Sequence, residues 1–161
     1  MEETSKLEKL KEEYSVLEKE NSLPSFSEMN EDFLIERISD METDFILREV
    51  RKQIAEKFSN TLRLIDILIN PSNTPAFLFP VIKSITKEDK EVMEKIYKEL
   101  SKTEISNLKL DLVYSSQNEI EYIKKSFLYW QEIKCDLLKV FLKVEDNWDK
   151  KPEKVNNCYF G

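Results

Sequence analysis

The chain contains a single glycine, and that glycine is the last residue, Gly161. Tight β-hairpin turns need residues at positive φ, a conformation supplied mainly by glycine and asparagine. A mostly β fold of 161 residues would need many such turns, and this sequence lacks the residues for them. We therefore expect an all-α fold, an elongated bundle of four to six helices that includes long antiparallel helices.

Histidine is absent, which removes imidazole bases, Ser-His and Cys-His nucleophile pairs and histidine-bearing metal sites. A glycine-rich phosphate loop is excluded as well. The 40% hydrophobic content is enough for one core, and the 35% of charged residues are mixed in sign, as on solvated helix faces. These features favour a non-catalytic protein without a cofactor.

The chain has no stretch of about 18 apolar residues and no apolar signal core at its start. Its two cysteines, Cys135 and Cys158, fit no metal-binding spacing. We expect no membrane partner, and a cytoplasmic or other reducing intracellular location.

Three segments are predicted: a coiled-coil-like helix at 1–22, a helical bundle at 23–150 and a flexible tail at 151–161. Pro24 ends the first helix, and Ser25 with Glu28 forms a capping box for the next. The first helix carries an apolar seam at three-four-three spacing, which we expect to be a contact surface: Leu7, Leu10, Tyr14 and Leu17.

The apolar face of residues 30–70 changes sides near residues 43–48, which fits either a break at 39–44 or one helix that meets different neighbours; we favour the break. Asn70-Pro71 ends this region, and Thr74-Pro75 predicts the start of a new helix. The sequence leaves open whether the proline-rich segment 70–80 is exposed. Thr86 with Asp89 predicts a capped helix to about Leu100.

One apolar stripe stays in phase from 103 to 149, which argues for a continuous helix, although residues 114–119 contain polar residues that fit a break. Three polar residues interrupt the stripe and predict a structural or interfacial role: Ser116, Glu119 and Lys134. Trp130 and Trp148 are candidate contact anchors. The stripe itself consists of Ile105, Leu108, Leu112, Ile123, Phe127, Trp130, Leu137, Phe141, Val144 and Trp148.

Carboxylates are the remaining candidates for chemistry. Glu36, Asp40 and Asp44 are spaced by four and would share one helical face, where they are either Mg²⁺ ligands or a solvated surface. The second interpretation is favoured, so no metal is predicted, and a Mg²⁺-dependent helical enzyme such as a nucleotide pyrophosphatase is an alternative.

The net charge of -7 and the lack of a basic stripe argue against direct nucleic-acid binding. A nucleic-acid-binding helical module would need four lysines of the C-terminal helix on one exposed face: Lys124, Lys125, Lys139 and Lys143. We instead predict a protein-interaction or assembly subunit that binds protein partners or itself.

Three stretches, "LPSFSEMNEDFLIERISD", "LREVRKQIAEKFSNTLRLIDILIN" and "ITKEDKEVMEKIYKEL", resemble the helical domain of GINS-type replication complex subunits. The resemblance covers about residues 23–100. It implies a non-catalytic scaffold beside a replicative helicase. GINS subunits also carry a small β domain, whereas residues 103–149 predict another long helix. The matching residues are Asp32-Phe33, Arg48, Arg51, Lys52, Arg63 and Ile85 to Asp89.

Overall fold

The structure is a computed structural model that describes residues 2–150, and the predicted flexible tail at 151–161 lies outside this range. The all-α fold is confirmed, since no strand occurs among the described residues. The α-helices are α1 (Glu2–Asn21), α2 (Phe26–Phe33), α3 (Ile46–Ile69), α4 (Phe79–Ser84), α5 (Lys87–Leu112) and α6 (Ser116–Asn147), and three 3-10 helices join them: η1 (Ile35–Asp40), η2 (Pro71–Asn73) and η3 (Ala76–Leu78).

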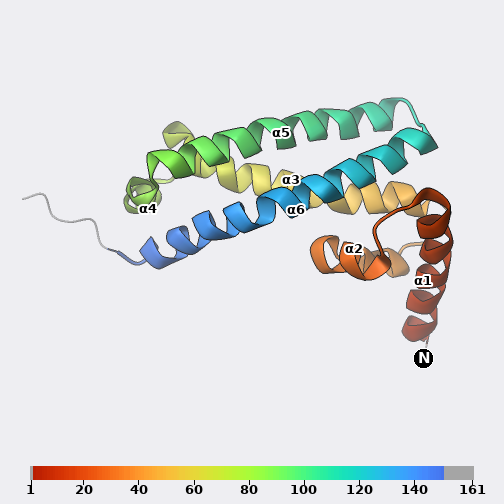
Figure 1. Ribbon diagram of the computed structural model, residues 1–161. Helices are drawn as coiled ribbons and strands as arrows, with labels where there is room; N and C mark the ends of the chain where they lie inside the picture. The colour runs from red at the N-terminus through yellow and green to blue at the C-terminus, as the bar shows by residue number, and fades with distance from the viewer. Residues whose placement is uncertain (1, 151–161) are drawn as a thin grey trace, which may run out of the picture.

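The long helices α3, α5 and α6 form the body of the molecule (Figure 1). Helix α5 runs antiparallel to α3, because Arg51 near the start of α3 bonds Asp111 near the end of α5, and Ser59 farther along α3 bonds Glu104. Helix α6 returns antiparallel to α5. The predicted elongated bundle with long antiparallel helices is therefore confirmed.

An aromatic cluster joins the start of the chain to the bundle. Phe33 of α2, Phe58 of α3 and Trp130 of α6 are buried, with ring centroids 5.9 to 6.3 Å apart. Burying one large apolar side chain contributes about 1.5–3 kcal/mol, so this cluster is a main link between α2 and the long helices.

Helix α1 lies at the end of the bundle where α5 turns into α6, whereas α4 lies near the opposite end (Figure 1). Tyr14 is fully buried, donates a hydrogen bond of 2.8 Å to the carbonyl of Pro24, and meets the Phe26 ring edge-on. Burial, and then the carboxylates of Glu18 and Glu28, raise the pKa of Tyr14 above its ordinary value. A marginal isolated helix is thus held by tertiary packing.

Local sequence signals locate several helix ends correctly. Both predicted capping boxes form: the Ser25 hydroxyl accepts from the Glu28 amide at 3.3 Å, and the Thr86 hydroxyl accepts from the Asp89 amide at 3.1 Å. The favoured break at 39–44 also occurs, since η1 ends at Asp40 and α3 begins at Ile46. Hydrogen bonding within a few residues is enough to set the two capped helix starts, whereas α3 begins without a side-chain cap.

The proline-rich segment differs from the prediction at Thr74. Its hydroxyl donates to the carbonyls of Ile67 and Asn70, so Thr74 satisfies the end of α3 and does not start a helix. The next residues form η3 and then α4. In this segment Thr74 and Leu78 are buried, whereas Phe77 is exposed.

Helix α5 continues past the expected end at Leu100 and stops at Leu112, where the chain reverses. The continuous helix across 103–149 is therefore wrong, and the alternative break is correct, with Ser115 as the N-cap of α6. Residues 103–112 belong to α5, so they pack against different elements from the rest of the stripe, which lies on α6. Three members of the predicted stripe, Ile105, Leu108 and Leu112, are consequently exposed.

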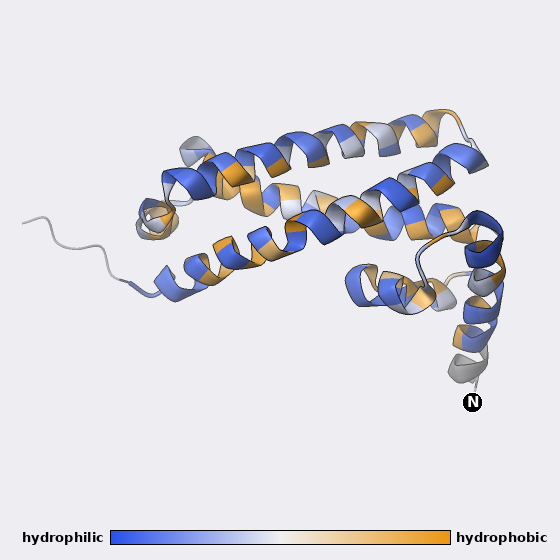
Figure 2. Cartoon of the chain, viewed as in Figure 1, coloured by the Kyte–Doolittle hydropathy of each residue, from blue (hydrophilic) through white to orange (hydrophobic). Residues whose placement is uncertain are grey.

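None of the helices between residues 2 and 150 has the length and apolar character needed to cross a bilayer. Coloured by hydropathy, the long helices show hydrophobic and hydrophilic residues in alternation along their length (Figure 2).

Candidate protein-contact surface

The predicted N-terminal contact seam is used inside the chain. Leu10 and Tyr14 are buried, and Leu7 and Leu17 are half-buried, because α1 packs against η1 and α2. Its apolar seam is therefore satisfied by the chain itself. Because this seam is used within the chain, α1 is a weaker candidate for a docking surface.

Glu36, Asp40 and Asp44 do not share an α-helical face, because the first two lie in a 3-10 helix and Asp44 follows the break. Glu36 is engaged by Asn30, whose side-chain amide donates to the carboxylate at 2.9 Å. Asp40 and Asp44 are exposed. Within residues 2–150 no group of three or more acidic or cysteine side chains is arranged to hold a metal ion.

The three polar residues of the predicted stripe are not brought together. Ser116 is exposed at the start of α6. Lys134 is half-buried and pairs with Asp32 of α2 at 3.4 Å, beside Gln131, which donates to the same carboxylate at 2.6 Å. Glu119 is buried against Arg51 of α3. Lys134 and Glu119 thus have structural roles, because each joins α6 to another helix.

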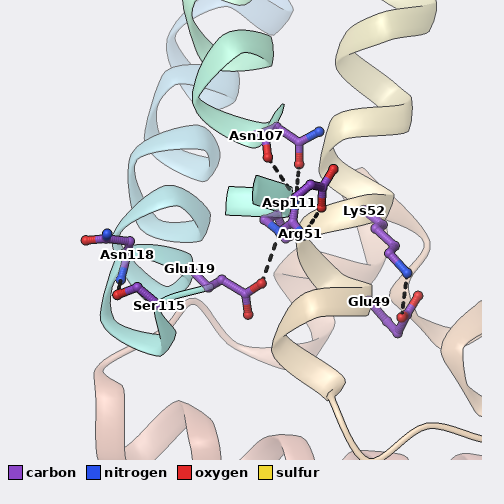
Figure 3. Close-up of polar contacts among 8 residues, drawn as sticks. All are labelled: Glu49, Arg51, Lys52, Asn107, Asp111, Ser115, Asn118 and Glu119. Carbon is purple, nitrogen blue, oxygen red and sulfur yellow. Dashed lines mark hydrogen bonds and ion pairs between the residues drawn. The ribbon is translucent and has the colours of Figure 1, made fainter. Parts of the chain in front are cut away.

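Arg51 is the centre of a polar cluster that joins three helices (Figure 3). Its Nε donates to Glu119 Oε1 at 3.2 Å, and its Nη2 donates to Asp111 Oδ1 at 2.7 Å. Its Nη1 donates to the backbone carbonyl of Asn107 at 3.2 Å and also to the Asn107 side-chain oxygen. The guanidinium therefore holds both sides of the α5–α6 turn against α3.

Burial makes this cluster sensitive to change. Arg51 and Glu119 are each 1% exposed, whereas Asp111 is half exposed. Two buried charges are tolerated only when they are paired and hydrogen-bonded. Glu119 Oε2 has no hydrogen-bond partner among the described residues. The cluster therefore has a structural role, because Arg51 is buried and not accessible to a ligand.

A groove of about 750 Å³ lies between α5 and α6. The hydroxyls of Tyr122 and Ser126 are buried at its lining without a hydrogen-bond partner among the described residues. Burial raises the pKa of Tyr122 to about 12, and the nearby Ser126 hydroxyl offsets part of this rise without reaching hydrogen-bond geometry. Three lysines line the same groove: Lys102, Lys109 and Lys125.

The two predicted tryptophan anchors have different environments. Trp130 is buried in the aromatic cluster, with the Lys57 ammonium 5.4 Å from its ring centroid. Trp148 is 52% exposed and meets Phe77 edge-on at 6.4 Å. Only Trp148 is therefore accessible to another molecule.

Helix α6 carries a second apolar seam that faces away from the bundle. We call it the outer face of α6, and it has heptad spacing, with Leu128, Cys135 and Leu142 at position a and Leu138 at position d. These four side chains are exposed, Leu128 by 62% and Leu138 by 58%. The buried seam of the helix lies about 170° around its axis, at 100° per residue.

Charged residues border the outer face of α6 at position e of the same heptads. From the start to the end of the helix they are Lys125, Glu132, Lys139 and Asp146, all exposed. Lys139 pairs within the helix with Asp136 at 3.0 Å. An apolar seam with flanking charges is the pattern of a helix that pairs with another helix.

The outer face of α6 was missed in the sequence because its apolar residues are interspersed with those of the stronger buried stripe. The heptad spacing of Leu128, Cys135 and Leu142 was the available signal. The nucleic-acid alternative gains no support, since Lys124 is half-buried and Lys143 bonds Asp89 at 2.8 Å. No family model, curated protein or solved structure matches the chain.

Proposed function

We propose that this protein is a non-catalytic helical interaction subunit that binds a protein partner through the outer face of α6. The observation that carries the proposal is a row of exposed apolar side chains at heptad spacing on the helix side opposite the core. Isolated exposed apolar residues are normal, but a seam of four along a charged border is typical of a contact site.

The architecture supports a rigid presentation of this surface. The inner side of α6 packs on α3, α4 and α5, and the Arg51 cluster fixes its first turn. The helix therefore offers its outer face without having to order itself on binding, which lowers the cost of association.

A photo-crosslinking amino acid placed at Leu138 tests the proposal in the cell that makes the protein. The expected result is one crosslinked product of discrete mass, which is lost when Leu142 is also changed to Glu. The matched control places the same amino acid at Leu108, which is 55% exposed on α5. No discrete product at Leu138, or the same product at both positions, would overturn the proposal.

Membership of a GINS-type replication complex stays a prediction from the sequence resemblance. Mass spectrometry of the Leu138 product tests it directly, because a replication protein in that product would support the resemblance.

A further inference from the structure

We propose that the partner of the outer face of α6 is a second copy of this chain, bound with the two α6 helices antiparallel. This inference rests on the proposed function, because it names what occupies the same surface. In the proposed register, Leu138 lies opposite Cys135 of the second copy, and Leu142 lies opposite Gln131 of the second copy. Gln131 keeps its bond to Asp32 of its own α2 and borders the contact from the side of α2. The charges that border the seam select this arrangement from the alternatives.

Antiparallel coiled coils place position a of one helix beside position d of the other, so the allowed registers differ by whole heptads. The position e side chains of the two helices then meet at the border. In the proposed register Lys125 meets Asp146 of the second copy, and Glu132 meets Lys139 of the second copy. Two-fold symmetry repeats both contacts, so four pairs of opposite charge border the seam.

The two neighbouring registers bring like charges together. A shift of one heptad in one direction places Glu132 against Glu132 of the second copy and Lys125 against Lys139 of the second copy. The opposite shift places Lys139 against its own copy and Glu132 against Asp146 of the second copy. A parallel pair would place Glu145, at position d, against itself. Like charges in contact disfavour these three arrangements.

The four charged residues are free to make these contacts. All of them are exposed, and of the four only Lys139 forms an ion pair within residues 2–150, an exposed bond to Asp136. Exposed pairs contribute little to folding, so exchanging this one for a contact across the interface has a small cost. The charge pattern is therefore available for selecting a partner and a register.

Sedimentation velocity of the purified full chain at micromolar concentration tests self-association. The expected result is a species of twice the 19.2 kDa chain mass for the wild type and a monomer for Leu138→Glu. The control is Leu108→Glu, an equally exposed leucine on α5, which should remain a dimer. A monomeric wild type, or a dimer that survives Leu138→Glu, would overturn the inference.

A charge exchange tests the register. Lys125→Asp and Asp146→Lys should each raise the dimer dissociation constant roughly tenfold, because each change sets two like-charge contacts in place of two attractive ones. The double variant should return to within about threefold of the wild type. Failure of the double variant to recover would exclude this register.

The experiments can refute the two proposals independently. A purified chain that is monomeric, together with a discrete Leu138 crosslink to a different protein, would end the self-association and leave the interaction subunit standing. Loss of both the dimer and the crosslink would end both.

Discussion

Arg51 and Glu119 are 68 residues apart in the chain, yet their side chains meet at 3.2 Å with only 1% of each exposed. The contact links α3 to the first turn of α6. Since Arg51 also bonds Asn107 and Asp111, one side chain joins both sides of the α5–α6 turn to α3. This cluster orients the helix whose outer face is the candidate contact surface.

Replacing Arg51 by Met should lower the free energy of unfolding by about 3–5 kcal/mol, because the Glu119 carboxylate is left buried without its partner. The double variant Arg51→Met with Glu119→Met should recover a large part of that loss, since no buried charge remains. Urea unfolding followed by circular dichroism measures both. Lys52→Met, next to Arg51 but half exposed, should change stability by less than about 0.5 kcal/mol.

The Asp89 carboxylate predicts a specific acid sensitivity. Its bond to Lys143, and then its bonds to Thr86, hold its pKa below the ordinary value of 3.8. A carboxylate with a lowered pKa in the folded state stabilises the fold above its unfolded pKa, and this contribution disappears as pH falls through the folded value. Asp89→Asn should therefore be less stable than the wild type at neutral pH, and the difference should close in acid.

Urea midpoints measured at neutral pH and at several pH values below 3.8 check this expectation. Glu88→Gln is the control, because Glu88 lies in the same first turn of α5 and is exposed. A difference between Asp89→Asn and wild type that stays constant on acidification would contradict the assignment.

The two tryptophans should respond very differently to truncation. Trp130→Ala empties the centre of the aromatic cluster and should cost about 3–5 kcal/mol, whereas Trp148→Ala should cost less than about 1.5 kcal/mol. Acrylamide quenching gives an independent readout: a Trp130→Phe variant, which keeps Trp148, should be quenched more strongly than a Trp148→Phe variant. Equal quenching would contradict the burial difference.

Tyr14 should control the docking of α1. Tyr14→Phe removes only the hydrogen bond to Pro24 and should cost about 1 kcal/mol. Tyr14→Ala also removes the buried ring, which should release α1 and abolish hydrogen-exchange protection of residues 7–17 while α5 stays protected. Peptide-resolved hydrogen exchange measures this. Unchanged protection in Tyr14→Ala would show that α1 is held by other contacts.

Much of the architecture was predictable from the sequence because it depends on neighbours along the chain. The scarcity of glycine indicated helices, and two capping boxes placed helix starts at Ser25 and Thr86. The chemistry of these ends acts over three residues, so no tertiary information is needed. The end of α3 at Asn70-Pro71 follows from the same kind of local constraint.

Other features were decided by tertiary structure. Periodicity shows which residues share a helix face, but not what that face meets. Ile105 and Leu108 are in phase with the core stripe, yet both are exposed. The chain reverses after Leu112, so α5 packs on its neighbours with a different face from the one that the stripe predicted. Arg51, read from the sequence as one of several basic residues, is buried because helices distant in sequence close around it. Only packing between distant segments separates the inner and outer seams of α6, since both obey the same helical period.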